Sequence, residues 1–272
     1  MTLFELIRAA IKEDMPRGDL TSECLGLPPR HGTARLIAKQ DLILSGATAF
    51  EQSIQFLEPN VRIKWHFEEG QKILQKQNIC TLQGDLIQIL KAERVALNFL
   101  MHLSGIATYT AMFVDQVKNT KTKILDTRKT LPGYRELEKK AVLHGGGQSH
   151  RLNLSTSILI KDNHIALAGG VREAIERIRR HTHLPLDVEA CSLDEVQQAV
   201  DCNVEHILLD NMDNDTLTKA LRLIPSHIRT EASGNMTLSR VQSVAALGVD
   251  FISVGALTHS APSADISLKF DW

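Results

Sequence analysis

The sequence predicts an α/β protein in which a small N-terminal sheet domain precedes an incomplete α/β barrel. The first hundred residues hold short segments of alternating polarity, separated by turn residues. After about residue 105, short apolar runs alternate with helical patterns at spacings of roughly 20 to 35 residues, which suits β-α units. Each apolar run also ends abruptly in charged, polar or glycine residues. We therefore expect one domain over residues 1–105 and a barrel over residues 106–259.

The N-terminal domain is expected to open with an amphipathic helix over residues 1–12. Leu3, Phe4, Ile7 and Ile11 are expected to share one side of this helix. Glu5 and Arg8 interrupt any apolar core of a signal peptide. No run in the chain approaches the roughly 20 apolar residues that a membrane helix needs. We therefore expect a cytoplasmic protein that does not associate with a membrane.

The remainder of the first domain is predicted to combine short strands with long helices. Residues 34–38 and 61–65 alternate as half-buried strands do. An apolar-rich helix should run from Asp85 to about Met101 and end near Ser104-Gly105, and a second helix should then reach about Val117. The tail at about 260–272 is a candidate to join this domain.

The second domain is predicted to contain six or seven β-α units, fewer than the eight of a standard barrel. In a parallel barrel the C-terminal ends of all strands open on one face, where active sites are built. Polar residues at six converging strand ends therefore predict a site. The six apolar strands are 123–125, 158–160, 186–188, 206–209, 229–232 and 251–254, with helical patterns at 171–180, 193–200, 215–223 and 238–246.

The overall composition excludes several classes of function. The 272 residues include 31 basic and 32 acidic side chains, so the chain carries no broad field for nucleic acid or a membrane surface. Any basic residues that matter must act as a local cluster. Four scattered cysteines lack metal-ligand spacing and are interpreted as reduced, small apolar residues: Cys24, Cys80, Cys191 and Cys202.

A cluster of cations is expected at the first strand ends. Arg128, Lys129, His150, Arg151 and Lys161 would lie near one mouth of the barrel. Gathering like charges costs several kcal/mol unless an anion neutralises them. Arginine also pairs with carboxylates and phosphates through two parallel hydrogen bonds. The cluster therefore predicts a compact ligand with several negative charges, and the alternative is a set of solvated surface charges.

Two carboxylates and a glycine run add to this site. Glu189 and Asp210 end the third and fourth strands, and together they suit Mg²⁺ shared with a phosphate-rich substrate. They could instead position ribose hydroxyls, or each could pair with a neighbouring lysine. Residues 145–147 are three glycines, which allow close backbone approach and would deliver His150 and Arg151.

The last strand ends and two single residues complete the candidates. Ser233-Gly234-Asn235 and Gly255-Ala256 are small and can offer backbone N–H groups to phosphate. Arg94 interrupts the apolar face of the long helix, and it is either functional or a partly buried arginine that pairs with an acid. Cys191 has no assigned base, so we do not expect it to be a nucleophile.

Several of these segments together resemble the quinolinate phosphoribosyltransferase family. The similarity reaches nearly the whole chain and is highly specific as a combination. The segments that carry it are Asp126 to Gly133, Glu138 to Val142, Gly145 to Gly147, His150-Arg151 and Leu159 to His164. They continue with Glu13-Asp14, Gly18 to Thr21, Glu93-Arg94, Ser104 to Thr108, Val188-Glu189, Leu209 to Asn211, Ser233-Gly234 and Asp250 to Ala256.

The resemblance implies transfer of a phosphoribosyl group from 5-phosphoribosyl-1-pyrophosphate to quinolinate with decarboxylation. The products would be nicotinate mononucleotide, CO₂ and pyrophosphate in NAD biosynthesis. It also implies an α/β sandwich-like N-terminal domain, Mg²⁺ as cofactor, and a head-to-tail homodimer in which Arg94 reaches the partner's site. The implied quinolinate ligands are Arg128, His150, Arg151 and Lys161. The implied residues for the phosphoribosyl donor and metal are Lys129, Glu189, Asp210, Ser233, Gly234, Gly255 and His259. Five neighbours in the same motifs are also expected to bind the substrates: Thr127, Thr130, Asn235, Val254 and Ala256. Four residues are expected to be catalytic: Lys129, Lys161, Glu189 and Asp210.

Three other functions compete with this one. A related protein associated with molybdenum transport shares the fold, but the intact Leu159–His164 segment and the full set of cations disfavour it. A nicotinate-specific transferase needs fewer cations for a single carboxylate. A non-catalytic barrel that binds a phosphorylated regulator does not require both Glu189 and Asp210. Small departures from the family pattern, such as Thr156 in place of a common acid, leave the charged set intact.

Overall fold

The computed structural model describes residues 1–271, which fold into two compact units. The first unit contains residues 1–111, 131–146 and the tail from residue 260 onward. The second contains residues 112–130 and 147–259. Residues 131–146, assigned above to the barrel segment, thus lie with the first unit.

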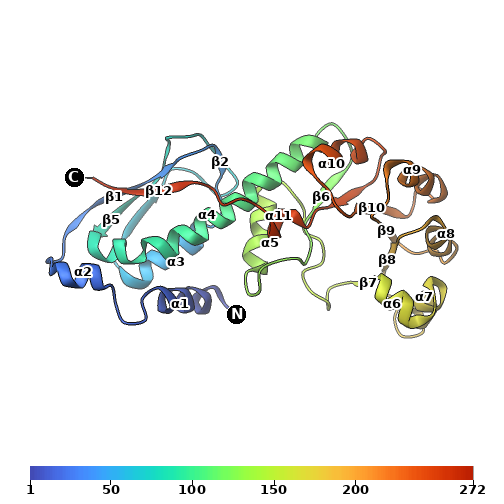
Figure 1. The fold of residues 1–272 in the computed structure, drawn as a ribbon, viewed down its shortest axis with the longest axis horizontal. Helices are drawn as coiled ribbons and strands as arrows, with labels where there is room; N and C mark the ends of the chain where they lie inside the picture. The colour runs from blue at the N-terminus through green and yellow to red at the C-terminus, as the bar shows by residue number, and fades with distance from the viewer. Residues whose placement is uncertain (272) are drawn as a thin grey trace. The chain divides into compact units, whose positions relative to one another are not determined.

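A four-stranded antiparallel sheet organises the first unit (Figure 1). Its order is β12-β1-β5-β3, so the last strand of the chain pairs at the edge of the first. The strands are β1 (His31–Ala38), β3 (Arg62–Trp65), β5 (Asn78–Asp85) and β12 (Ile266–Phe270), and a separate short pair joins β2 (Leu42–Ile43) to β4 (Lys72–Ile73).

Five helices belong wholly or mostly to this unit. The first is capped at its N-terminus, because the Thr2 hydroxyl and the Glu5 carboxylate form a reciprocal capping box. The helices are α1 (Leu3–Asp14), α2 (Leu20–Leu25), α3 (Ala47–Leu57), α4 (Leu86–Val117) and α5 (Arg135–His144).

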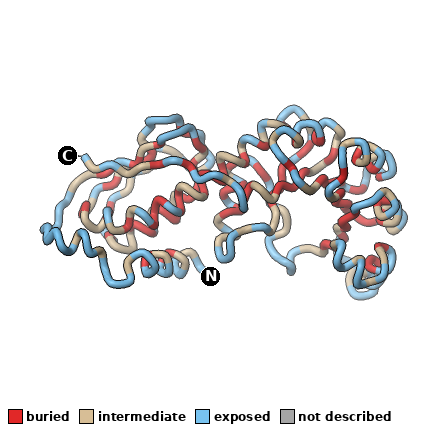
Figure 2. The backbone as a smooth tube through the Cα atoms, in the orientation of Figure 1, coloured by how far each residue is buried: buried red, intermediate tan, exposed pale blue. Residues whose placement is uncertain are grey.

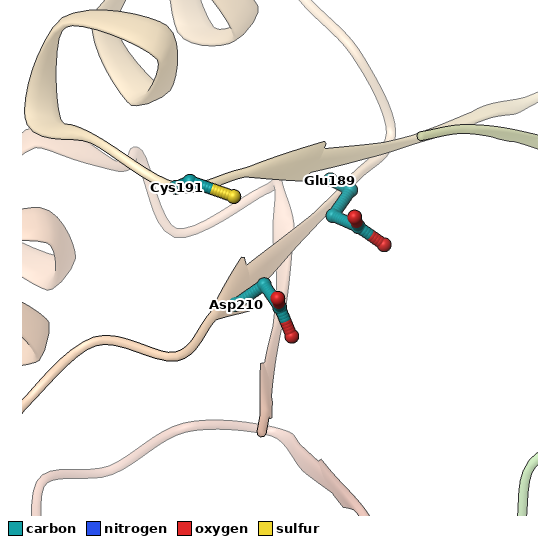
Figure 3. Close-up of side chains that lie close together, drawn as sticks. All are labelled: Glu189, Cys191 and Asp210. Carbon is teal, nitrogen blue, oxygen red and sulfur yellow. The ribbon is translucent and has the colours of Figure 1, made fainter. Parts of the chain in front are cut away.

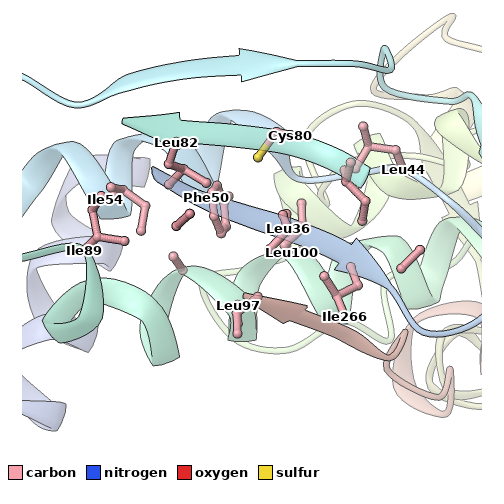
Figure 4. Close-up of a cluster of buried hydrophobic side chains, with 14 of the residues drawn as sticks. Leu36, Leu44, Phe50, Ile54, Cys80, Leu82, Ile89, Leu97, Leu100 and Ile266 are labelled. Carbon is pink, nitrogen blue, oxygen red and sulfur yellow. The ribbon is translucent and has the colours of Figure 1, made fainter. Parts of the chain in front are cut away.

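The core of the first unit lies between the sheet, α3 and α4. Leu36 and Leu82 come from neighbouring strands, Phe50 from α3, and Leu97 from α4, and each is at most 2% exposed (Figure 4). Ile266 brings β12 into the same cluster. The alternation predicted for residues 34–38 therefore places one face of β1 in this core.

The long helix α4 differs from the sequence expectation. We expected one helix to end near Ser104-Gly105 and another to follow, but α4 runs unbroken through both residues. A Cβ on Gly105 would lie 2.2 Å from the carbonyl oxygen of Pro262 and 2.9 Å from Cα of Ser263. The glycine is therefore required because another backbone segment packs directly on the helix, and it does not end the helix.

Helix α4 is long and apolar enough to cross a membrane by length and composition alone. An 18-residue stretch of this helix has a mean hydropathy of 1.2, and 56% of that stretch is buried inside the protein. Ile89, Ala96 and Leu100 of this helix are completely buried in the first unit. Packing in a protein core thus accounts for the apolar character of α4.

The second unit is an open arc of six parallel strands in the order β6-β11-β10-β9-β8-β7. The expected incomplete barrel is confirmed, with six strands. They are β6 (Lys123–Leu125), β7 (Ile158–Ile160), β8 (Leu186–Ala190), β9 (His206–Asp210), β10 (Arg229–Ser233) and β11 (Phe251–Ser253). The helices are α6 (Asp162–Ala168), α7 (Val171–Arg179), α8 (Leu193–Asp201), α9 (Asn214–Leu223), α10 (Leu238–Ala245) and α11 (Ala256–His259).

Strand register determines which side chains share a face of this sheet. Glu189, Leu208 and Glu231 are directly aligned across β8, β9 and β10, and Asp210 aligns with Ser233 one layer nearer the strand ends. The strands are largely buried, whereas the outer surfaces of the helices are exposed (Figure 2). Because parallel strands direct their C-terminal ends the same way, polar side chains gather at one rim.

All four cysteines are free thiols, but they are not all small buried residues. Cys80 lies in the core of the first unit, and burial raises the pKa of its thiol strongly. Cys24 and Cys191 are exposed, so interpreting all four as apolar packing residues is wrong for these two.

Candidate active site

A cavity of about 520 Å³ opens at the C-terminal ends of the second unit's strands. All of its lining residues belong to this unit. The structure brings eleven of the predicted site residues together in this cavity: Thr127, Arg128, Lys129, His150, Arg151, Lys161, Glu189, Asp210, Ser233, Gly234 and Asn235.

The turn after β6 supplies three of these residues. The Lys129 backbone N–H donates to the Thr127 hydroxyl (3.1 Å), and the Thr258 hydroxyl donates to the Lys129 carbonyl (2.8 Å). Arg128 is half-buried, and its Nε is a buried donor without a hydrogen-bond acceptor in residues 1–271. Because such a donor is costly to bury unpaired, Arg128 is suited to an anionic ligand in the cavity.

The segment carrying His150 and Arg151 is anchored to β6. Gln148 donates to the carbonyl of Ile124 (2.8 Å), and the completely buried carboxylate of Asp126 accepts the backbone N–H of His150 (2.8 Å). The preceding glycines allow this path, because a Cβ on Gly145 would lie 2.4 Å from the Ala107 carbonyl oxygen. The glycine run thus permits close packing just before the segment reaches the cavity.

The two guanidinium groups in the cavity are close enough to interact electrostatically. Burial lowers the pKa of Arg151, the positive charge of Arg128 lowers it further, and Asp187 partly opposes both effects. Arg151 also donates from Nη1 to the carbonyl of Ser157 (3.2 Å). Two like charges at one cavity favour a ligand that carries more than one negative charge.

Lys161 and Glu189 form an ion pair at the cavity. The Nζ of Lys161 is 2.5 Å from Oε2 of Glu189, and the side chains are 43% and 8% exposed. The sequence analysis left open that Glu189 pairs with a neighbouring lysine, and this pairing is present. Lys161 therefore contributes less free positive charge to the cavity than its sequence position alone indicates.

Three potential metal ligands lie close together at this rim, namely Glu189, Asp210 and Cys191 (Figure 3). One ligand atom from each lies within 4.8 Å of the other two. Asp210 accepts a hydrogen bond from the Asn211 side chain (2.7 Å). Burial and the nearby carboxylates, Asp210 first among them, raise the pKa of the Cys191 thiol. A raised pKa opposes thiolate formation, so it supports the expectation that Cys191 is not a nucleophile.

The turn after β10 depends on a glycine. Gly234 has φ of 92°, and a Cβ there would lie 2.2 Å from the side-chain oxygen of Asn211. The Asn235 side chain donates to the same oxygen (3.3 Å), and Nη1 of Arg240 donates to the Gly234 carbonyl (2.9 Å). These contacts fix the ends of β9 and β10 beside each other, with Ser233 facing the cavity.

The remaining predicted residues of the second unit lie next to the cavity and are not among its lining residues. A Cβ on Gly255 would lie 3.0 Å from Cδ of Lys129 and 3.2 Å from Nε2 of His259, so these three residues are neighbours. Val254 donates to the Leu125 carbonyl (3.0 Å), which joins β11 to β6. Ala256 begins α11, and Thr130 closes the turn by donating to the Arg128 carbonyl (2.9 Å).

Arg94 lies on α4 in the first unit and is not among the residues that line this cavity. Its side chain is exposed, so the alternative of a partly buried arginine is wrong. The neighbouring Glu93 interacts with it electrostatically, although burial still raises the pKa of Glu93.

The sequence analysis missed several lining residues. Asn211 was visible beside Asp210, and its φ of 55° is one signal of a constrained turn. Glu231 gave no such signal because it lies inside a strand. Side chains alternate between the two faces of a strand, and a polar residue there is ordinarily expected to face solvent. The cavity is also lined by Leu159, Leu208 and Ser253.

Comparison with known proteins agrees with this arrangement over nearly the whole chain. The family model for the N-terminal domain of quinolinate phosphoribosyl transferase matches residues 19–104, and the model for its C-terminal domain matches residues 106–269. A probable nicotinate-nucleotide pyrophosphorylase [carboxylating] of Synechocystis is 41% identical, covering 95% of this chain and 89% of the relative.

The chain belongs to the quinolinate phosphoribosyltransferase family. A Nicotiana tabacum relative whose name includes "quinolinate phosphoribosyltransferase [decarboxylating]" and "mitochondrial" is 37% identical over 99% of this chain and 82% of its own length. The solved structure of the nicotinate-nucleotide pyrophosphorylase from Francisella tularensis superposes with a TM-score of 0.94 at 36% identity, covering 99% of this chain and 96% of that one. The family's fold thus extends over both units.

Proposed function

We propose that this chain catalyses phosphoribosyl transfer from 5-phosphoribosyl-1-pyrophosphate to quinolinate with decarboxylation, forming nicotinate mononucleotide, CO₂ and pyrophosphate in NAD biosynthesis. Family membership supports the reaction, and one observation carries the substrate choice. Arg128 and Arg151 lie at one cavity, one with a buried unpaired donor and the other with a lowered pKa. A planar dicarboxylate would neutralise both guanidinium groups.

The residues contribute mainly by binding and orienting the two substrates. The pyridine nitrogen forms a bond to C1 of the ribose while the bond from C1 to the pyrophosphate oxygen breaks. Lys129 lines the same cavity as Ser233-Gly234 and lies beside Gly255, and together these residues would stabilise the phosphates. The carboxylate at C2 then leaves as CO₂, and C2 takes a proton. Fixing the nitrogen close to C1 supplies acceleration through proximity and orientation.

We also propose that Mg²⁺ is required and that Glu189 and Asp210 hold it. Two carboxylates at one rim suit a hard cation that completes its shell with phosphate and water oxygens, whereas the Cys191 sulfur does not. When bound, Mg²⁺ would neutralise negative charge on the pyrophosphate. Glu189→Ala and Asp210→Ala should lower turnover while leaving quinolinate binding, measured alone by calorimetry, nearly unchanged. Full activity in excess chelator would refute the metal's role.

The direct test of the function is a product assay. Purified protein, quinolinate, phosphoribosyl pyrophosphate and Mg²⁺ should yield nicotinate mononucleotide and one equivalent of CO₂. Arg128→Ala provides a matched control, because it should reduce product formation without unfolding the barrel. Absence of nicotinate mononucleotide with folded wild-type protein and both substrates present would overturn the proposal.

We further propose a cytoplasmic homodimer in which the exposed Arg94 completes the partner's site. Arg94→Ala should fold and dimerise yet lose most activity. Lys161→Ala should also be inactive, because it removes a residue of the barrel cavity and leaves Arg94 intact. Mixed dimers would hold one site with both residues intact. After random subunit exchange the mixture should regain up to about a quarter of wild-type activity, as two-fold symmetry requires. Verified heterodimers that stay inactive would contradict the shared site.

A further inference from the structure

Glu231 is a buried carboxylate in the wall of the active-site cavity. It lies on β10 with an exposed fraction of 0%, and neither of its oxygens has a hydrogen-bond donor within residues 1–271. A carboxylate removed from water needs nearby positive or donor groups to offset its lost hydration. Two imidazoles lie within ion-pair distance without completing a hydrogen bond, since Oε2 is 3.5 Å from Nε2 of His150 and 3.4 Å from Nε2 of His206.

The hydrogen bonds of His150 indicate which of its ring nitrogens faces Glu231 as a donor. Nδ1 accepts the backbone N–H of Arg151 at 2.7 Å, so Nδ1 carries no proton. The ring proton of the neutral imidazole is therefore on Nε2, the nitrogen that faces the carboxylate. One ring thus connects the buried carboxylate to the backbone of a cavity arginine.

His206 is the second imidazole near Glu231, and its other ring nitrogen contacts Asp187. Nδ1 of His206 is 3.2 Å from Oδ1 of Asp187, while Nε2 faces Glu231. Both ring nitrogens of His206 thus face carboxylates, and a ring nitrogen that carries a proton can act as a donor toward the carboxylate it faces. His206 is 5% exposed, so these contacts are shielded from solvent.

A second cavity explains why His150 needs this support. It has a volume of about 420 Å³ and is lined by His206 and Asp187, and it shares His150, Arg151 and Glu231 with the active-site cavity. These three residues therefore form a wall with open space on both sides. The His150 side chain, which is 13% exposed, borders both cavities, so its polar contacts contribute to the orientation of the ring.

We infer that Glu231 is a positioning residue for quinolinate binding, which holds the His150 ring and, through that ring, the Arg151 segment at the cavity. The inference rests on the proposed function. Removing the carboxylate frees the ring to turn toward the second cavity and loosens the backbone N–H contact of Arg151. Quinolinate affinity then falls because a guanidinium no longer meets its carboxylate, while affinity for the phosphoribosyl donor is unchanged.

The test compares Glu231→Leu, which removes the acceptor, with Glu231→Gln, whose amide oxygen can still accept from Nε2. Quinolinate and phosphoribosyl pyrophosphate are titrated separately by calorimetry. Glu231→Leu should weaken quinolinate binding about tenfold or more, Glu231→Gln should restore most of it, and donor binding should match wild type in both. Asp85→Leu is the control, because Asp85 is a carboxylate of the first unit that is 7% exposed, and its loss should lower stability alone.

Two further measurements separate positioning from general destabilisation. Proton NMR of the unliganded protein should show a slowly exchanging ring N–H signal of His150, which is assigned by its loss in His150→Phe. This signal should be absent in Glu231→Leu and present in Glu231→Gln. In the Arg151→Ala background, Glu231→Leu should add little further loss of quinolinate affinity. Additive losses, or wild-type quinolinate affinity in Glu231→Leu, overturn the inference. Failure of the wild-type protein to bind quinolinate instead overturns the proposed function itself.

Discussion

Selectivity between quinolinate and nicotinate follows from the two cavity arginines. Nicotinate lacks the carboxylate at C2, so replacing quinolinate by nicotinate removes one negative charge from a cavity that holds Arg128 and Arg151. Lys161 is already paired with Glu189, so the difference rests on the guanidinium groups. A buried charged donor left without its acceptor costs about 2–3 kcal/mol, which corresponds to roughly a hundredfold in kcat/KM.

The assay measures kcat/KM for both acids at saturating phosphoribosyl donor, in wild type and in Arg128→Ala. Wild type should prefer quinolinate by about a hundredfold or more, and Arg128→Ala should narrow this ratio because it removes the unmatched cation. Arg128→Lys keeps the charge and loses the paired hydrogen bonds, so its kcat/KM ratio for the two acids should lie between the ratios of wild type and Arg128→Ala. Comparable kcat/KM values for the two acids in wild type would refute the reasoning.

Three other predictions concern stability. Lys161→Met leaves the buried Glu189 unpaired and should lower the free energy of unfolding by about 1–2 kcal/mol, given the partial exposure of the lysine. The Lys161→Met/Glu189→Gln double variant should recover this stability in thermal melting, and additive losses from the two changes would contradict the pairing. Gly105→Ala should lower Tm, although alanine ordinarily favours a helix, because its Cβ would meet the Pro262 carbonyl; a raised Tm would exclude this contact. The pKa of Glu69 is lowered despite burial, chiefly by the Gly46 N–H and Lys140, so its stabilisation is present above the ordinary glutamate pKa and is lost as pH falls through the folded value. The Tm advantage of wild type over Glu69→Gln should therefore shrink below about pH 4, and a constant difference would disprove it.

The barrel and its rim could be predicted because one local pattern encodes both. A short apolar strand followed directly by charged residues indicates a buried parallel strand and a polar strand end, as at Lys161 and Asp210. Topology then brings such ends together without any further information. Eleven of the predicted residues lie at one cavity for this reason.

Features that depend on contacts distant in sequence could not be predicted. Gly105 appears to end a helix until the segment at Pro262 is placed against it. Glu231 has the polarity of a solvent-facing strand residue, but the structure buries it completely beside two histidines. The ion pair that occupies Lys161 requires β7 and β8 to be neighbours, and residues 161 and 189 are far apart in the chain.

The pairing of β12 with β1 has a consequence for synthesis of the protein. Strand β1 leaves the ribosome early, but the strand that covers its edge is made only after the entire second unit. At about 5–20 residues per second, this leaves an apolar strand with an unpaired edge for roughly ten seconds or more. Such edges recruit other nascent chains, so the N-terminal unit is exposed to misassembly while the barrel is still being translated.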